Sequence, residues 1–189
     1  MNLINMEAFS PVKVPPKIRQ GAAAKEIAFS IGESALGAVL VARSADGVCA
    51  ILIGSEAAEL ERDLATRFTD SKLVRNDRKL SDDLRKVLRF IEVPSEGLNL
   101  PLDIRGTPFQ QRVWEALLRI PIGATVTYGA LAHRIGEPGA VRAVANACAA
   151  NAIALAIPCH RVVRSNGTLS GYRWGVERKR ALLAKEALA

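Results

Sequence analysis

Residues 127–150, TYGALAHRIGEPGAVRAVANACAA, decide the fold class of the carboxy-terminal half of the chain. Residues 128–135 and 140–150 have helical periodicity, and the sequence Gly-Glu-Pro-Gly at 136–139 between them is typical of a turn. Two short helices joined by such a turn form a helix-turn-helix pattern. We therefore predict a mainly α-helical carboxy-terminal domain that contains this pattern.

The second of these helices has an outer surface of small side chains. Its predicted inner stripe is Val141, Val144 and Cys148. The other positions are Arg142, Ala143, Ala145, Asn146, Ala149 and Ala150. Long polar side chains that could read base edges in the major groove are nearly absent, so we predict sequence-independent docking in the minor groove of DNA. An alanine-rich helix that only packs against its own domain fits the spacing equally well.

Residues 157–161, IPCHR, are the strongest candidate for chemistry. A free thiol is mostly protonated near neutral pH, and the residues after Cys159 offer a base, His160, and a cation, Arg161. Consecutive side chains of a strand point to different faces, so His160 acts on the thiol directly or through an ordered water. The alternative is a buried core cysteine next to a hydrogen-bonded histidine.

The amino-terminal half of the chain is typical of a small α/β domain. Residues 27–53 contain short apolar runs, and the turn sequence at 44–47 predicts a hairpin with Cys49 in its second strand. Residues 56–68 and 81–91 have helical periodicity, and we predict Ser81 as the N-cap of the second helix. The apolar positions predicted for that helix are Leu84, Val87, Leu88 and Ile91.

Interruptions of these patterns divide the chain into three predicted parts. Residues 1–24 contain three prolines and scattered cations, and we predict a flexible lead or linker remnant without a site. The pattern breaks again near residues 94–100, so we predict domains at 25–97 and 98–189. The second domain opens with a helix at Thr107-Pro108, in which Phe109 and Trp114 are expected to be ordinary core.

Composition limits the classes of function. The chain has 189 residues, a formal net charge of +7 and a pI near 9.7, which favour a polyanionic partner such as nucleic acid. Its three cysteines have no metal-ligand spacing, so we predict no disulfide, no structural zinc and no cofactor. Because no apolar stretch could span a bilayer and no export signal is evident, we expect a cytoplasmic protein. We also expect a monomer, although no pattern in the sequence determines the oligomeric state.

The sequence from Ile157 to Val163, with Arg142-Ala143-Val144 and Asn151 upstream, resembles the O6-alkylguanine-DNA alkyltransferase family. The resemblance extends roughly from Ile27 to Glu186. It is closest to the carboxy-terminal part of bacterial Ada proteins, through residues 102–107 (LDIRGT) and 167–176 (GTLSGYRWGV). It implies a ribonuclease-H-like α/β amino-terminal domain and a carboxy-terminal domain with a winged-helix-like helix-turn-helix.

The resemblance also implies a reaction, the repair of double-stranded DNA by one irreversible alkyl transfer per molecule. The alkyl group, mainly methyl, passes from O6-alkylguanine or O4-alkylthymine to Cys159, after the base has been rotated out of the duplex. By similarity His160 takes the thiol proton through a water, Glu186 orients the imidazole, and Asn151 braces the network. Tyr128 donates a hydrogen bond to the purine as negative charge develops on it.

Further roles follow from the resemblance for DNA contact and substrate size. Arg142 enters the base stack in place of the extruded base, the neighbouring Ala143 and Ala145 allow close approach, and Ser165 contacts phosphate. The backbone amides near Tyr172 and Arg173 hold O6. The residues expected to form the wall of the pocket are Tyr172, Arg173 and Trp174. Because of the ring at Trp174, we predict that methyl is accepted more readily than benzyl.

Three other functions remain open for these residues. A DNA-lesion sensor, or a transcriptional regulator with a structural Cys159, would bind DNA without alkyl transfer. A thiol hydrolase would need an oxyanion site and an ester or amide pocket, which the sequence does not reveal. The cysteine-zinc module of Ada proteins has no counterpart in this sequence, so phosphotriester repair and gene activation are not expected.

Overall fold

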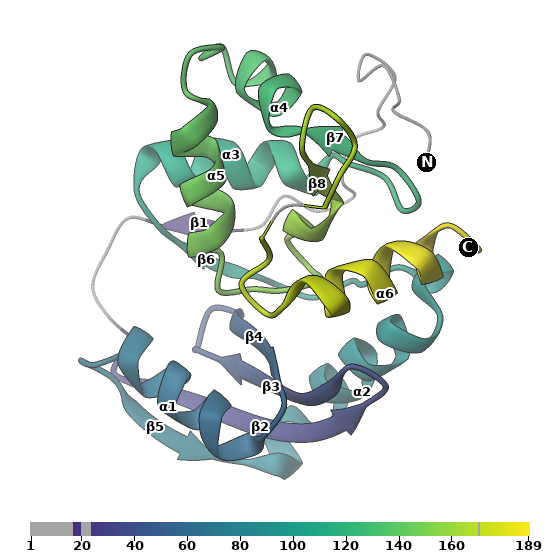
Figure 1. The fold of residues 1–189 in the computed structure, drawn as a ribbon. Coiled ribbons are helices and arrows are strands. Elements are labelled where there is room, and N and C mark those ends of the chain that lie inside the picture. The colour runs from purple at the N-terminus through teal and green to yellow at the C-terminus, as the bar shows by residue number, and fades with distance from the viewer. Residues whose placement is uncertain (1–16, 20–23, 170) are drawn as a thin grey trace. The chain divides into compact units, whose positions relative to one another are not determined.

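The computed structural model describes residues 17–19, 24–169 and 171–189, which fall into two compact units (Figure 1). The amino-terminal unit runs to Arg105 and includes Ala152–Ala156, and the carboxy-terminal unit comprises Gly106–Asn151 and Ile157–Ala189. The first is α/β and the second mainly helical, as predicted at this level. Within the described residues, no helix is both long and apolar enough to cross a membrane.

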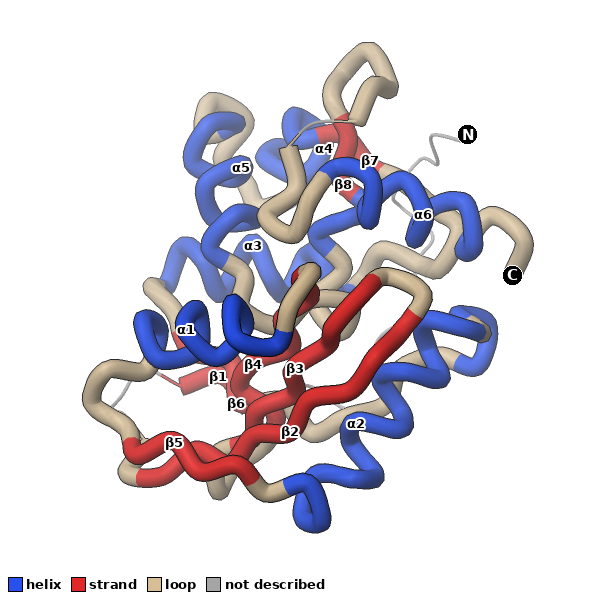
Figure 2. Tube along the Cα trace, turned by 60° about the horizontal axis from the view of Figure 1, so that its bottom comes forward, coloured by secondary structure: helices blue, strands red, loops and turns tan. Residues whose placement is uncertain are grey.

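A four-stranded sheet in the order β4-β3-β2-β5 forms the core of the amino-terminal unit (Figure 2). Strands β2 (Glu26–Ser34), β3 (Gly37–Arg43) and β4 (Val48–Gly54) are antiparallel neighbours, and β5 (Lys72–Arg75) pairs parallel with β2. The predicted hairpin joins β3 to β4, where the Ser44 amide donates to the Gly47 carbonyl at 2.9 Å. Every residue of β4 is buried, Cys49 included.

Helices α1 (Ala57–Arg67) and α2 (Asp77–Glu92) cover opposite faces of this sheet. A Cβ at Gly54 would meet Leu60 of α1, whereas one at Gly32 would meet Leu84 of α2. Gly54 is paired with one residue of β3 and Gly32 with the next, and consecutive strand residues face opposite ways. A glycine in the strand beneath each helix therefore leaves room for a leucine side chain of that helix.

Helix α2 begins earlier than predicted, and Ser81 is not its cap. The side chain of Asn76 accepts a hydrogen bond from the Lys79 amide at 2.9 Å, so Asn76 caps the helix. Ser81 lies inside the helix, where its hydroxyl donates to the Arg78 carbonyl at 3.1 Å. The earlier start adds Leu80 to the buried face.

Short pairings tie residues around 100 to the amino-terminal unit. Strand β1 (Lys17–Arg19) pairs parallel with β6 (Asp103–Arg105), and Leu102 bridges to Val48. Because these pairings hold β6, the units divide after Arg105, beyond the change of domain predicted near 94–100. Strand β1 also lies within the segment predicted to be a flexible lead; residues 1–16 and 20–23 lie outside the described residues.

The carboxy-terminal unit contains the predicted helix-turn-helix. Helix α3 (Pro108–Leu118) precedes β7 (Val126–Thr127), α4 (Tyr128–Arg134) and α5 (Val141–Ala150). The 3₁₀ turn η3 (Cys159–Arg161), strand β8 (Val162–Val163) and helix α6 (Val176–Glu186) follow, and β8 pairs parallel with β7. The predicted start of α3 is confirmed, because Thr107 and Gln110 form a reciprocal capping box.

Helix α5 is held by α3 and by its own buried stripe. The indole of Trp114 donates to the Ala147 carbonyl at 2.9 Å. The buried stripe is Val144, Ala147 and Cys148, and the predicted member Val141 is 38% exposed. Val141 lies in the first turn of the helix, where it borders a pocket instead of the core.

Candidate active site

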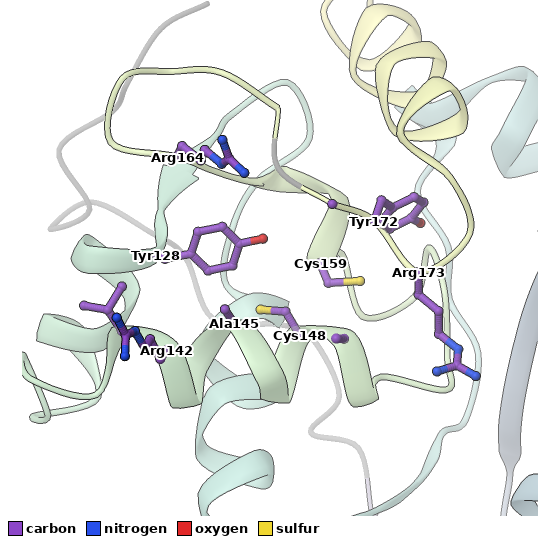
Figure 3. Close-up of a pocket in the computed structure, with 11 residues that line it drawn as sticks. Tyr128, Arg142, Ala145, Cys148, Cys159, Arg164, Tyr172 and Arg173 are labelled. Carbon is purple, nitrogen blue, oxygen red and sulfur yellow. The ribbon is translucent and has the colours of Figure 1, made fainter.

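A pocket of about 540 Å³ lies within the carboxy-terminal unit, between α4, α5, η3 and the loop that follows β8 (Figure 3). Six of the residues predicted for the site line it: Cys159, Tyr128, Arg142, Ala145, Tyr172 and Arg173. Residues of the helix-turn-helix and a thiol therefore line one cavity, as the family resemblance implies.

Cys159 is a buried thiol held by an amide. The Asn151 Nδ2 atom donates to Cys159 Sγ at 3.3 Å and to the Ile157 carbonyl at 2.9 Å. Burial raises the pKa of Cys159 to about 11, although the hydrogen bond from Asn151 and the charge of Lys179 act in the opposite direction. At neutral pH the sulfur therefore remains a thiol and needs a base for nucleophilic chemistry.

His160 is the candidate for that base, and Glu186 gives its ring a defined orientation. His160 Nε2 lies 2.8 Å from Glu186 Oε1, and both side chains are fully buried. Burial alone would raise the pKa of Glu186, but hydrogen bonds from His160 and Arg161 outweigh it and lower the pKa to about 2. An ionised carboxylate accepts hydrogen bonds only, so Nε2 carries the proton and Nδ1 keeps its lone pair.

The free nitrogen of His160 is available for proton transfer. Nδ1 is buried and has no hydrogen-bond partner among the described residues. Burial also lowers the pKa of His160, which keeps the ring neutral near pH 7. A neutral imidazole with an unused lone pair, next in sequence to a buried thiol, is suited to act as a general base.

Arg161 does not act on the thiol, contrary to its predicted role as a nearby cation. Its guanidinium makes two hydrogen bonds to Glu186, at 2.8 and 2.9 Å, and a third to the Ile120 carbonyl. A 3₁₀ helix has about three residues per turn, so side chains two positions apart point in different directions, and Arg161 and Cys159 reach different neighbours. Arg161 instead fixes the carboxylate that orients His160.

The positive charge near the sulfur comes from Lys179, which the sequence analysis missed. Lys179 is fully buried on α6, its Nζ donates to the Val162 carbonyl, and its charge lowers the pKa of Cys159. The buried face of α6 is Lys179, Leu182, Leu183 and Glu186. This i, i+3, i+4, i+7 spacing, with a charged residue at each end, could have revealed both buried charges.

Two tyrosines, Tyr128 and Tyr172, line the pocket, and a buried tryptophan packs on one of them. Tyr128 is half-buried, and its hydroxyl points toward Cys159 (Figure 3). Tyr172 lines the pocket and packs edge-to-face on Trp174, with 5.1 Å between the ring centroids. Trp174 is buried behind Tyr172 and does not line the pocket, so its predicted place in the wall is wrong. Arg173 borders the cavity, but its side chain points away from Cys159 (Figure 3).

The residues predicted to contact DNA are spread over two elements. Arg142 and Ala143 are exposed on α5, and Ala145 is half-buried beside them. Ser165 is exposed in the turn after β8 and does not line the pocket, whereas its neighbour Arg164 does. Arg164 is another residue of this site that the sequence analysis missed.

Comparisons with known proteins agree on one family. The chain matches the family described as 6-O-methylguanine DNA methyltransferase, DNA binding domain, over residues 108–188. It is 49% identical over 171 residues to the bifunctional transcriptional activator/DNA repair enzyme Ada of Escherichia coli strain K12, which covers 90% of this chain and 48% of Ada. It is 42% identical to the inducible methylated-DNA--protein-cysteine methyltransferase of Bacillus subtilis, over 65% of this chain and 69% of that protein.

Solved structures give the same result. The crystal structure of Mycobacterium tuberculosis O6-methylguanine methyltransferase superposes with a TM-score of 0.72 at 35% identity, covering 86% of this chain and 93% of that one. A structure of the same Mycobacterium protein in complex with DNA superposes with a TM-score of 0.69 at 34% identity, over 85% and 93% of the two chains.

Fold and site together define a protein that presents a buried thiol, followed in sequence by a neutral imidazole, in a pocket beside a helix-turn-helix. The chain belongs to the O6-methylguanine-DNA methyltransferase, or methylated-DNA--protein-cysteine methyltransferase, family. It spans about half the length of the Ada relative, 48%.

Proposed function

We propose that this protein repairs alkylated double-stranded DNA by transferring a methyl group from O6 of guanine, or O4 of thymine, to Cys159. The observation that carries the proposal is the buried series Cys159, His160 and Glu186, of which Cys159 lines a pocket bordered by α5. Membership of the family supports it, as does the complex of the related Mycobacterium protein with DNA.

The reaction follows from the orientation of His160. Nδ1 takes the proton of Cys159 through an ordered water. Nε2 keeps its own proton, which it donates in the hydrogen bond to Glu186. The sulfur then attacks the methyl carbon, so that the S–C bond forms as the C–O6 bond breaks. The electron pair of that bond remains on the purine, and Tyr128 stabilises the resulting negative charge by a hydrogen bond. The purine anion then takes up the proton that left Cys159, which the imidazolium of His160 returns through water. Asn151 and Lys179 stabilise the thiolate before attack.

Each molecule reacts once. The product is a thioether, and carbon–sulfur cleavage would need a stronger nucleophile than any group lining the pocket. We therefore propose a single-turnover suicide enzyme that uses neither metal nor cofactor.

DNA docking is assigned to α5. We propose that the exposed Arg142 and the small side chains Ala143 and Ala145 enter the minor groove, that Arg142 replaces the extruded base, and that Ser165 contacts phosphate. In this proposal the carboxy-terminal unit is winged-helix-like and the amino-terminal unit ribonuclease-H-like.

We propose that Tyr172 and Trp174 together limit the size of the alkyl group that the pocket accepts. Trp174 limits the cavity indirectly, because it packs on Tyr172 and prevents that ring from moving back. We therefore propose that methyl is accepted more readily than benzyl, with Arg173 beside the same wall. The rates of inactivation by free O6-benzylguanine and by methylated duplex DNA test this proposal; equal rates would contradict it.

The central experiment measures the mass of the protein after incubation with duplex DNA that contains one O6-methylguanine. We expect a gain of one methyl group per molecule, mapped to Cys159 and absent from Cys159→Ala. The matched control is Cys49→Ala, which removes the buried thiol of β4 and should still gain the methyl group. Tight binding of the lesion without any gain in mass would indicate a lesion sensor instead.

A further inference from the structure

Arg164 borders the pocket of Cys159 but has no part in the transfer chemistry. It follows β8, whereas Arg142 belongs to α5, and Tyr128 is seen between the two side chains (Figure 3). The charged residues that line this pocket are Arg142, Arg164 and Arg173, and no carboxylate is among the lining residues that the structure describes. The mouth of the pocket is therefore electropositive on two sides.

The turn that carries Arg164 is tightly built. The Arg164 amide donates to the Thr168 carbonyl at 3.1 Å, and the Gly167 amide donates to the Arg164 carbonyl at 2.9 Å. Asn166 Oδ1 accepts from the amide and the hydroxyl of Thr168, at 3.1 and 2.7 Å. Gly167 has a φ of 76°, which a residue with a side chain rarely adopts. The turn fixes the backbone from which the exposed Arg164 side chain extends.

A base that enters this pocket brings its own sugar and phosphates to the mouth, because they are covalently attached to it. The two phosphates of an extruded nucleotide lie on either side of its sugar, so Arg164 can meet one of them while Arg142 enters the base stack. Guanidinium groups suit this task, since their planar donors match phosphate oxygens. Arg173 is less well placed, because its side chain points away from Cys159 (Figure 3).

We propose that Arg164 binds a backbone phosphate next to the extruded nucleotide and thereby selects a base within a DNA strand over a free nucleoside. The proposal rests on the proposed function and adds a contact to it. Arg142 replaces the extruded base in the stack, whereas Arg164 holds the strand that the base has left.

The test compares two substrates that differ in phosphate. The rate of methyl transfer is measured from a duplex with one O6-methylguanine and from O6-methyl-2′-deoxyguanosine, which has no phosphate. For Arg164→Ala we expect the ratio of duplex to nucleoside rates to fall by about tenfold, as for loss of one charge-assisted hydrogen bond. Arg164→Lys should recover part of the ratio. The matched control is Arg180→Ala, an exposed arginine of α6 paired with Glu177, which should leave the ratio unchanged.

Binding to unmodified duplex provides a second readout. The slope of log affinity against log salt should become less steep by about 0.9 in Arg164→Ala, as for loss of one phosphate contact. An equal fall of both transfer rates, or a salt slope like that of the wild type, would overturn the proposal. If the wild type methylates itself with neither substrate, the proposed function fails, and the salt slope still tests Arg164.

Discussion

The two units bury their charged side chains in different ways. In the amino-terminal unit, Asp83 and Asp103 are buried, but their partners Arg43 and Arg105 keep 23% and 24% of their side chains exposed. In the carboxy-terminal unit, Glu186 and His160 have no exposed side-chain surface, and Arg161 has 7%.

The pairs of the amino-terminal unit are therefore partly solvated ion pairs near its surface, whereas the charges of the carboxy-terminal unit form a buried network next to the pocket. Water can still hydrate an arginine that is a quarter exposed, so its carboxylate partner is never isolated. In the Arg161–Glu186 pair the carboxylate has no exposed side-chain surface and the arginine has 7%, so loss of one leaves the other charged and buried. The same buried groups define the tautomer of His160, because Arg161 holds the Glu186 carboxylate to which Nε2 of His160 donates.

Removal of one arginine from each unit should give the largest difference. We expect Arg161→Ala to lower the free energy of unfolding of its unit by about 3–5 kcal/mol, because Glu186 is left buried without its guanidinium. Arg43→Ala should cost about 1 kcal/mol, since its pair with Asp83 is partly solvated. Urea unfolding followed by tryptophan fluorescence reports the carboxy-terminal unit, which holds both tryptophans, Trp114 and Trp174, and circular dichroism reports both units. Equal losses would mean that burial does not distinguish the pairs.

The same network should make the carboxy-terminal unit sensitive to acid. The pKa of Glu186 is lowered from 4.5 to about 2, so its stabilising contribution is complete above pH 4.5 and is lost as the pH falls through about 2. The loss should reach about 3 kcal/mol. The lowered pKa of His160 acts in the same direction, because protonation below its ordinary pKa of 6.5 favours the unfolded chain.

The measurement is the free energy of unfolding as a function of pH, and two variants of α6 serve as test and control. Glu186→Gln should flatten the dependence of unfolding free energy on pH between 4.5 and 2, because the titrating carboxylate is gone. Glu177→Gln changes an exposed carboxylate of α6 and should leave the wild-type curve. A wild-type curve in Glu186→Gln would show that other groups cause the acid sensitivity.

The sequence predicts local features of the site and the fold well. The start of α3, the hairpin of β3 and β4, and the two helices of the helix-turn-helix all depend on short-range patterns, and all are present. The grouping of Cys159 with Tyr128 and Arg142 in one pocket was predicted by resemblance, since no spacing in the sequence indicates it.

Tertiary partners explain what the sequence could not give. The side chain of Arg161 reaches Glu186 and Ile120, which lie 25 and 41 residues away, so its neighbours in sequence suggested the wrong role. Trp174 is near Tyr172 in sequence but lies behind it in space, because its ring is buried. Ser81 fits an N-cap pattern, yet Asn76 forms a cap that starts the helix earlier.

The two tryptophans offer a smaller test of buried polar groups. Trp114→Phe removes the donor to the Ala147 carbonyl and should cost about 1–2 kcal/mol beyond the change in ring size. Trp174→Phe should lack this added cost, since Trp174 Nε1 is buried with no hydrogen-bond partner among the described residues. Urea unfolding followed by circular dichroism measures both variants. A greater loss in Trp174→Phe would mean that ring packing outweighs the hydrogen bond.

The helix caps provide the smallest comparison between the units. Thr107 caps α3 through a capping box in which two backbone amides are satisfied, whereas Asn76 caps α2 through one amide. Thr107→Ala should therefore cost about 1–1.5 kcal/mol in the carboxy-terminal unit, and Asn76→Ala about 0.5–1 kcal/mol in the amino-terminal unit. Hydrogen exchange of the first-turn amides assigns each loss to its helix, because only the amides released from the cap should exchange faster. Gln110→Ala removes the other half of the capping box and should cost less than Thr107→Ala. A larger loss would mean that the side chain of Gln110, and not the hydroxyl of Thr107, stabilises the first turn of α3. That turn matters for the site because α3 holds α5 through the hydrogen bond from Trp114 to Ala147.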